Sequence, residues 1–156
     1  MAAAANTDRT AQIWEILRSV PDPEIPVVNI VELGMVRAVD NDYVVLTTTY
    51  VGCPATDVIF SDVRAALSEN GLAHVRIDIT HSPAWTTDWI EDAAKEKLLA
   101  YGIAPPRAVG ANDARPNCPR CGSGHTKLVS QFGSTPCKSH HKCQDCLEPF
   151  DAFKCH

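Results

Sequence analysis

Apolar residues recur at helical spacing over the first twenty positions. Four of them share one face of a helix with 3.6 residues per turn: Ile13, Ile16, Leu17 and Val20. Asn6 or Thr7 is the expected N-cap, and Pro21 and Pro23 end the pattern. We therefore expect an amphipathic helix, followed by a proline-punctuated loop with a short turn over residues 22–35.

An alternating pattern replaces the helical one after residue 35. Residues 36–50 read VRAVDNDYVVLTTTY and predict a β-hairpin whose turn is formed by residues 40–42. Residues 74–80, HVRIDIT, predict a third strand in which apolar and polar positions alternate. Such alternation is typical of a sheet that is covered on one face.

A helix is expected between the hairpin and the third strand. It follows Cys53, because Pro54 suits the first turn of a helix, where its missing N–H has no partner to lose. Asn70 and Gly71 supply its C-cap. Its expected apolar face consists of Ile59, Val63, Ala66 and Leu67.

Another helix is expected after the third strand. Asp88 and Glu91 form a capping-box-like start, and Gly102 closes the helix. Trp85 and Trp89 are expected as its cap and core residues, whereas an exposed Trp85 would mark a partner surface. Its expected apolar face consists of Ile90, Ala94, Leu98 and Tyr101.

The predicted order is helix, two strands, helix, strand, helix. This order indicates a compact α/β fold in which helices pack against a small sheet. We expect this domain over residues 1–102, a linker rich in proline and polar residues over 103–117, and a second domain over 118–156. The second domain is too short for an apolar core of its own and is expected to need a metal to fold.

Composition is that of a globular protein, with 45% hydrophobic and 21% charged residues among 156. The sequence shows neither a signal-peptide pattern nor an apolar run of membrane-spanning length, so we expect a cytoplasmic protein without a membrane partner. Residues 1–117 carry 9 Lys and Arg against 16 Asp and Glu, and residues 118–156 carry 5 against 3. These balances, −7 and +2, argue against a nucleic-acid partner.

Six of the seven cysteines fall between Cys118 and Cys155. Four of them form two CxxC units separated by 21 residues: Cys118, Cys121, Cys143 and Cys146. Two tight turns of this kind direct four sulfurs at one tetrahedral ion, and the spacing is close to that of a zinc ribbon. The sequence therefore predicts a structural Zn²⁺ site, although thiolates alone would also accept iron.

Other residues of the same segment are additional potential ligands. One interpretation is that one or two of them substitute for the CxxC cysteines or lie beside them. The other is a second, labile metal site formed by Cys137 and Cys155. The full set is Cys137, His140, His141, Cys155 and His156.

Cys53 is the candidate reactive thiol of the first domain. A helix N-terminus stabilises a thiolate, so this cysteine could bind a metal or cluster, or it could be a small buried side chain. The sequence suggests no base nearby that would make it an enzyme nucleophile. Asp22 and Glu24 lie on the loop after the first helix, where solvated carboxylates of a turn are the simpler interpretation.

Both parts of the chain resemble one protein family. The stretches DPEIPVVNIVELGMVR, TYVGCPA and SPAWTTDWI resemble signature stretches of the SufT-like iron–sulfur assembly family. The tail stretches CPRCGS, FGSTPCK and CQDCLEPFDAFKCH resemble the zinc-ribbon extension of the PaaD branch of that family. The resemblance covers the chain from about residue 10 to its end.

The resemblance implies a non-catalytic factor that matures the iron–sulfur cluster of the multicomponent phenylacetyl-CoA epoxidase, the ring 1,2-epoxidase of aerobic phenylacetate degradation. Its implied partners are the epoxidase components, above all the 2Fe–2S reductase, and the cluster-assembly machinery. By position, Cys53 matches the family's reactive cysteine, Asp22 and Glu24 its acidic motif, and the CxxC cysteines its ribbon ligands. The implied cofactors are a structural Zn²⁺ and a transient iron–sulfur cluster.

A lone thiolate is a weak, exchangeable ligand, which suits transfer of a cluster. A second thiolate would come from a partner, a second copy of the chain or the tail. Three other interpretations remain: a structural or docking subunit of the epoxidase, a zinc-ribbon nucleic-acid module, and an independent thiol enzyme. The acidic first domain argues against the second, and the lack of a recognisable base argues against the third.

Overall fold

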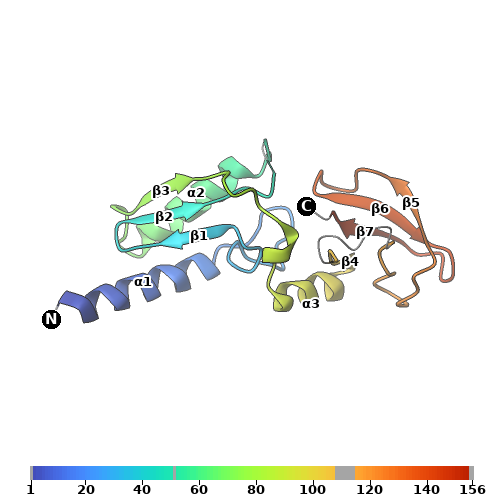
Figure 1. Cartoon of the computed structure of the whole chain (residues 1–156), viewed down its shortest axis with the longest axis horizontal. Helices are drawn as coiled ribbons and strands as arrows, with labels where there is room; N and C mark the ends of the chain where they lie inside the picture. The colour runs from blue at the N-terminus through green and yellow to red at the C-terminus, as the bar shows by residue number, and fades with distance from the viewer. Residues whose placement is uncertain (1, 51, 108–114, 155–156) are drawn as a thin grey trace. The chain divides into compact units, whose positions relative to one another are not determined.

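The computed structural model describes residues 2–50, 52–107 and 115–154 (Figure 1). The chain divides into two compact units, a first unit of Met1–Trp85 and a second unit of Thr86–His156. Each unit has its own sheet, with three strands in the first and four in the second.

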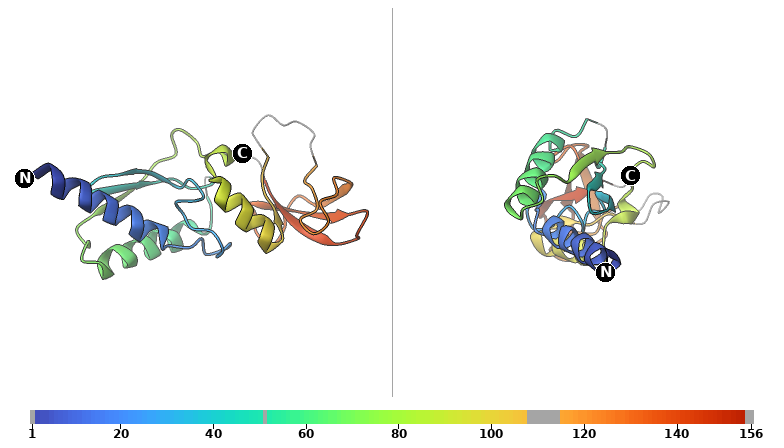
Figure 2. Two further views of the ribbon diagram at one scale, coloured as in Figure 1. Left: turned by 90° about the horizontal axis from the view of Figure 1, so that it is seen from below. Right: turned by 90° about the vertical axis from the view of Figure 1, so that its left-hand side faces the viewer.

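The first unit is an α/β fold with strand order β1-β2-β3. β1 and β2 form the predicted antiparallel hairpin, and β3 pairs parallel to β2 after a crossover through α2. α2 covers one face of the sheet, and α1 packs along α2 and β1 (Figure 2). The elements are α1 (Ala2–Arg18), β1 (Val36–Val39), β2 (Tyr43–Leu46), α2 (Thr56–Glu69) and β3 (Arg76–Ile79).

The helices of the first unit bury the expected faces. Ile13 and Leu17 of α1 and Val63 and Leu67 of α2 are fully buried. α1 begins at Ala2, ahead of the expected cap at Asn6 or Thr7, because its first turn is a run of alanines with high helix propensity. α2 begins at Thr56, with Ala55 as N-cap, and ends at Glu69, with the predicted Asn70 as its C-cap.

Trp85 belongs to the first unit and not to the last helix, where it was expected. Its side chain is 5% exposed, and its indole N–H donates to the carbonyl of Leu33 at 2.8 Å. This hydrogen bond satisfies the polar atom of a large buried ring. The bond ties the end of the first unit to the loop before β1.

The second unit contains a short helical segment and a four-stranded sheet with strand order β4-β7-β6-β5. β4 pairs parallel to β7, whereas β7, β6 and β5 pair antiparallel. The elements are η1 (Thr87–Trp89), α3 (Asp92–Tyr101), β4 (Ile103–Ala104), β5 (Thr126–Ser130), β6 (Lys138–Cys143) and β7 (Pro149–Phe153).

The last helix begins later than the sequence predicted. The hydroxyl of Thr86 accepts from the N–H of Asp88 and caps a 3-10 turn, and α3 starts only at Asp92. Ile90, Ala94 and Leu98 are buried as expected, whereas Tyr101 is 55% exposed. Gly102 ends the helix with a φ of +92°, a conformation that glycine adopts without steric cost.

Residues 103–117, the expected linker, begin with a strand. Ile103 and Ala104 pair with Asp151 and Ala152 of β7, so the start of this segment extends the second sheet. Two buried apolar residues can add to a sheet edge although they are too few to show a strand pattern. Residues 108–114 lie outside the described part of the chain.

None of the helices in the described part of the chain is long and apolar enough to span a membrane.

Candidate metal centre and reactive thiol

Two turns of the second unit carry the CxxC cysteines. Cys118 and Cys121 precede β5, and the N–H of Gly122 donates to the carbonyl of Cys118 at 2.8 Å. Gly122 has a φ of +76°, which permits this tight turn. Cys143 is the last residue of β6, and Cys146 lies in the bend between β6 and β7.

The structure brings the four sulfurs together. The Sγ atoms of Cys118 and Cys146 are 3.7 Å apart, and those of Cys121 and Cys143 are 3.6 Å apart. All four Sγ atoms lie within 4.8 Å of one another. A zinc–sulfur bond of about 2.3 Å gives a tetrahedron with edges of about 3.8 Å, so the arrangement fits one tetrahedral ion.

The chemistry of the four thiols also fits a cation. The N–H of Cys146 points at the sulfur of Cys143 at 3.5 Å, and this contact is the main cause that lowers the pKa of Cys143 to about 7. The N–H of Glu148 lowers the pKa of Cys146, but burial and the three neighbouring thiols outweigh it and raise that pKa to about 12. Four thiolates in this volume therefore need a bound cation to offset their repulsion.

A polar bridge links the two turns beside the sulfurs. The hydroxyl of Ser123 donates to the carboxylate of Asp145, and Nδ1 of His125 lies 3.1 Å from the same carboxylate. These contacts hold the two cysteine pairs in register, as outer hydrogen bonds do in metal sites. We did not predict this bridge, and its only signal in the sequence is the presence of polar residues next to each CxxC unit.

The additional potential ligands that the structure describes do not join this cluster. Cys137 is buried, and its sulfur lies 3.0 Å from the hydroxyl of Thr135. The four CxxC cysteines are the one group of potential ligands found among the described residues, and it includes neither Cys137, His140 nor His141. Cys155 and His156 lie outside the described residues.

His140 instead joins a polar cluster around Asp151. The Asp151 carboxylate lies 2.9 Å from Nδ1 of His140 and 3.7 Å from Nζ of Lys138, and it accepts from the N–H and hydroxyl of Ser134. Burial raises the pKa of Asp151, but these partners outweigh it and keep the pKa below its usual value. Because the Lys138 side chain is 6% exposed, the pair is largely removed from water.

His141 lies on the other face of β6. Its ring stacks on Phe150, with ring centroids 5.6 Å apart, and its Nε2 atom lies 2.8 Å from the hydroxyl of Ser139. Burial, followed by the nearby His140, lowers the pKa of His141. His141 therefore packs and hydrogen-bonds within the sheet, and among the described residues it is not part of the group formed by the four sulfurs.

Cys53 lies in the loop between β2 and α2. Its N–H donates to the carbonyl of Tyr50 at 3.3 Å, and its own carbonyl accepts from the N–H (3.1 Å) and the hydroxyl (2.8 Å) of Thr56. The side chain is partly exposed, and it precedes the N-cap Ala55 by two residues. The loop therefore holds one thiol in a fixed backbone position at the surface of the first unit.

Asp22 and Glu24 have different environments. Asp22 is 8% exposed, and its carboxylate accepts from the N–H groups of Glu24 (2.9 Å) and Ile25 (2.8 Å). These two hydrogen bonds form an Asx-type turn in the loop that follows α1. Glu24 is half-buried, so the acidic motif combines a carboxylate that holds the loop with one that is more accessible.

Two family models match the chain. The model of an iron–sulfur cluster assembly protein matches residues 10–79, and the PaaD zinc beta ribbon domain matches residues 103–154. A relative from Escherichia coli (strain K12), provisionally named as a subunit of the 1,2-phenylacetyl-CoA epoxidase, is 46% identical over 151 residues, which cover 92% of each chain. The chain therefore belongs to the PaaD family, in which a SufT-like iron–sulfur assembly domain is joined to a zinc ribbon.

Two further matches cover a smaller part of the chain. An iron–sulfur protein maturation auxiliary factor from Porphyromonas gingivalis (strain ATCC BAA-308 / W83) is 40% identical over 92 residues, which cover 55% of this chain and 87% of the relative. The crystal structure of a DUF59 domain from Bacillus anthracis is 30% identical, covers 62% of this chain and 96% of its own, and gives a TM-score of 0.57. The predicted fold class, an α/β assembly domain with a zinc ribbon, is confirmed.

Proposed function

We propose that this protein is a non-catalytic maturation factor for the phenylacetyl-CoA epoxidase, and that it delivers an iron–sulfur cluster to the 2Fe–2S reductase component. The observation that carries the proposal is the 46% identity, over 92% of both chains, to a relative that bears the name of an epoxidase subunit. The match to an iron–sulfur assembly model supplies the maturation activity. Since reduced thiols persist in a reducing compartment, we place this activity in the cytoplasm.

In this proposal the second unit binds one Zn²⁺ through Cys118, Cys121, Cys143 and Cys146. A closed four-cysteine site leaves no open position for a substrate, so its zinc has a structural role. The distances between the sulfurs support a cation at this position.

Cys53 is the proposed ligand for the cluster in transit. It is the one cysteine of residues 1–117, so it contributes one thiolate, and the remaining ligands come from a donor, an acceptor or a second copy of the chain. Transfer is then an exchange of ligands, in which cysteine thiolates of the acceptor replace the Cys53 thiolate and no electron is gained or lost. Asp22 holds the loop after α1, and Glu24 is the more accessible acidic group of the motif.

The proposal is tested by maturation of the reductase in cells that lack the native factor. We expect Cys53→Ser to lower the iron and sulfide content of the purified reductase about tenfold, and Val58→Ala to leave it unchanged. Val58 is a matched control, because it lies on the exposed side of α2 with 47% of its surface accessible. Full maturation by Cys53→Ser would contradict a role for this thiol.

The same experiment distinguishes a docking subunit from a maturation factor. A structural subunit of the epoxidase would co-purify with the oxygenase in stoichiometric amounts and would not depend on Cys53. A maturation factor is expected to be absent from the mature complex, because its contact with the reductase ends when the cluster has been transferred.

A further inference from the structure

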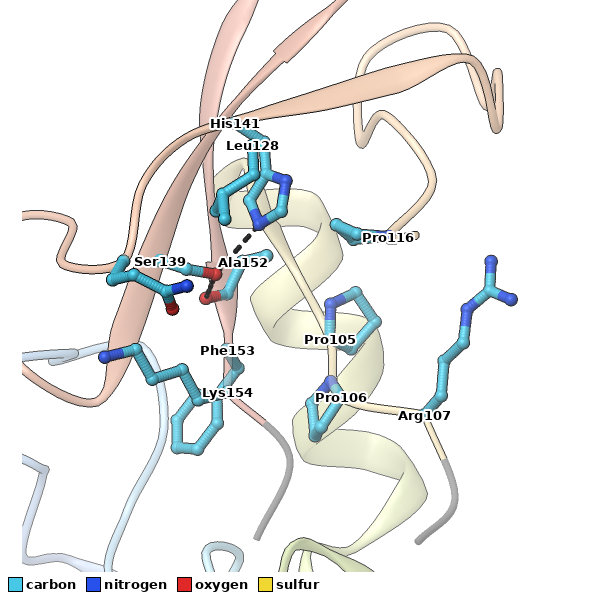
Figure 3. A pocket seen from close by; sticks show the side chains of 11 residues that line it. Pro105, Pro106, Arg107, Pro116, Leu128, Ser139, His141, Ala152, Phe153 and Lys154 are labelled. Atoms are coloured by element: carbon cyan, nitrogen blue, oxygen red, sulfur yellow. Dashed lines mark hydrogen bonds between the residues drawn. The ribbon is translucent and has the colours of Figure 1, made fainter. Parts of the chain in front are cut away.

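A groove of about 350 Å³ lies within the second unit, between a proline-rich wall and the face of the sheet (Figure 3). Pro105, Pro106 and Pro116 form one wall, and side chains that include Leu128 and Phe153 form the other. Proline has no N–H and a fixed φ, so this wall is rigid and offers few backbone donors. The groove is open on one side and large enough for part of an extended peptide.

Two polar side chains lie at the base of the groove. The His141 ring points into it and is hydrogen-bonded to Ser139 (Figure 3). Nε2 of His141 lies 2.8 Å from the Ser139 hydroxyl, and that hydroxyl lies 3.5 Å from the carbonyl of Ala152. His141 is 7% exposed, and its Nδ1 atom has no hydrogen-bond partner among the described residues.

The groove has a positive charge at both edges. Arg107 and Lys154 are among its eleven lining residues, none of which has a carboxylate. The two side chains project on opposite sides of the groove (Figure 3). Nη2 of Arg107 donates to the side chain of Asn117 at 2.6 Å, and Nζ of Lys154 lies 4.1 Å from the centroid of the Phe132 ring.

We propose that this groove binds an acidic, extended peptide segment of a partner protein. Carboxylates of the segment pair with Arg107 and Lys154, and an apolar side chain packs against Pro105 and Pro116. Identification of the partner as the protein that receives the cluster rests on the proposed function; the groove itself does not.

The groove is tested with the full zinc-bound chain and a model peptide. The probe is an acetylated and amidated hexapeptide of sequence EELEEL, titrated while amide chemical shifts are recorded by NMR at low salt. We expect shifts at Ser139, His141 and Ala152, and none with the matched peptide KKLKKL. Because the contact is partly ionic, 0.5 M salt is expected to weaken it about tenfold.

Charge reversal identifies the residues that bind. The double variant Arg107→Glu with Lys154→Glu is expected to weaken peptide binding at least about tenfold, with zinc content unchanged. The matched control is Lys97→Glu with Lys127→Glu, which makes the same change in net charge at two exposed residues outside the groove. Absence of shifts in the groove, or equal effects of the two double variants, would overturn the proposal.

Purified reductase replaces the peptide in the last step, and its dissociation constant is measured with both double variants. Weakening by the groove variant alone supports the reductase as the partner. Peptide binding without any binding of reductase would contradict the reductase as the partner, whereas the assignment of the groove as a peptide-binding site would stand. Loss of maturation in Cys53→Ser, with intact binding of reductase, would show that docking and cluster transfer are separate steps.

Discussion

The two units of the chain bury their interiors in different ways. Among the twelve largest fully buried side chains of the described residues, Leu98 belongs to the second unit and the other eleven to the first. A separate buried cluster of the second unit combines Ala104, Phe150 and Ala152 with two CxxC cysteines, Cys118 and Cys143.

This difference indicates two sources of stability in one chain. The first unit is stabilised by apolar burial, at about 25 cal/mol for each Å² removed from water. The sheet of the second unit places the proposed metal ligands where a larger domain would place Leu or Ile, so we expect its stability to be linked to the ion. Cys53, the proposed cluster ligand, lies in the first unit, which we expect to fold without the metal.

Removal of the metal is expected to have the largest effect. Binding of a structural zinc ion contributes on the order of 10 kcal/mol to folding, so a strong chelator is expected to unfold the sheet of the second unit and leave the first unit folded. Amide NMR spectra measure this directly, since resonances of β5 to β7 would collapse while those of β1 to β3 persist. Dispersed resonances for β6 after complete removal of the metal would contradict the account.

Truncation of a buried apolar side chain is expected to destabilise the first unit and to leave the second unit unchanged. Leu67 is fully buried in α2, and Leu67→Ala is expected to lower the free energy of unfolding of the first unit by about 3 kcal/mol. Zinc content is expected to stay unchanged. Denaturant unfolding gives the free energy, and Val58→Ala on the exposed side of the same helix is the control. Loss of zinc in Leu67→Ala would show that the units are coupled.

Loss of a buried ion pair is expected to destabilise the second unit by a similar amount. Asp151→Asn removes the charge that faces Lys138, which is largely buried, and is expected to cost about 3 kcal/mol. Glu148→Gln is the control, because its pair with Arg120 is exposed and is expected to contribute less than about 1 kcal/mol. Thermal unfolding of the zinc-bound protein measures both, and equal effects would contradict this assignment.

The acidic loop is expected to show the smallest effect on stability. Asp22→Ala removes the acceptor of two backbone N–H groups and is expected to cost about 1 kcal/mol, whereas Asp22→Asn keeps the acceptor and costs less. Reductase maturation by the stable Asp22→Asn and Glu24→Gln variants then reports the functional role of the acids. Full activity of both would assign the motif to loop structure alone.

The sequence predicted those features that depend on local pattern. The hairpin, the third strand and the buried faces of α1 and α2 follow from periodicity, and the CxxC spacing indicated the sulfur cluster. Proline in the first helical turn and the capping box misplaced the starts of α2 and α3, because both signals tolerate a shift of a few residues.

The remaining features depend on contacts between residues far apart in the chain. β4 has two residues, which are too few to form a sequence pattern that would indicate its pairing with β7. Trp85 precedes α3 by seven positions in the sequence, yet its indole N–H donates to the carbonyl of Leu33, 52 positions away. The groove combines prolines of the expected linker with side chains of three strands, and no spacing rule predicts such a set.

The most direct test of the account is the metal and acid-labile sulfide content of protein purified without oxygen. Wild type, Cys53→Ser and Cys121→Ser are compared in parallel. We predict about one zinc per chain in wild type and Cys53→Ser, loss of zinc in Cys121→Ser, and iron with sulfide in wild type but not in Cys53→Ser. Iron and sulfide retained in Cys53→Ser would contradict the assignment of the cluster to the first unit.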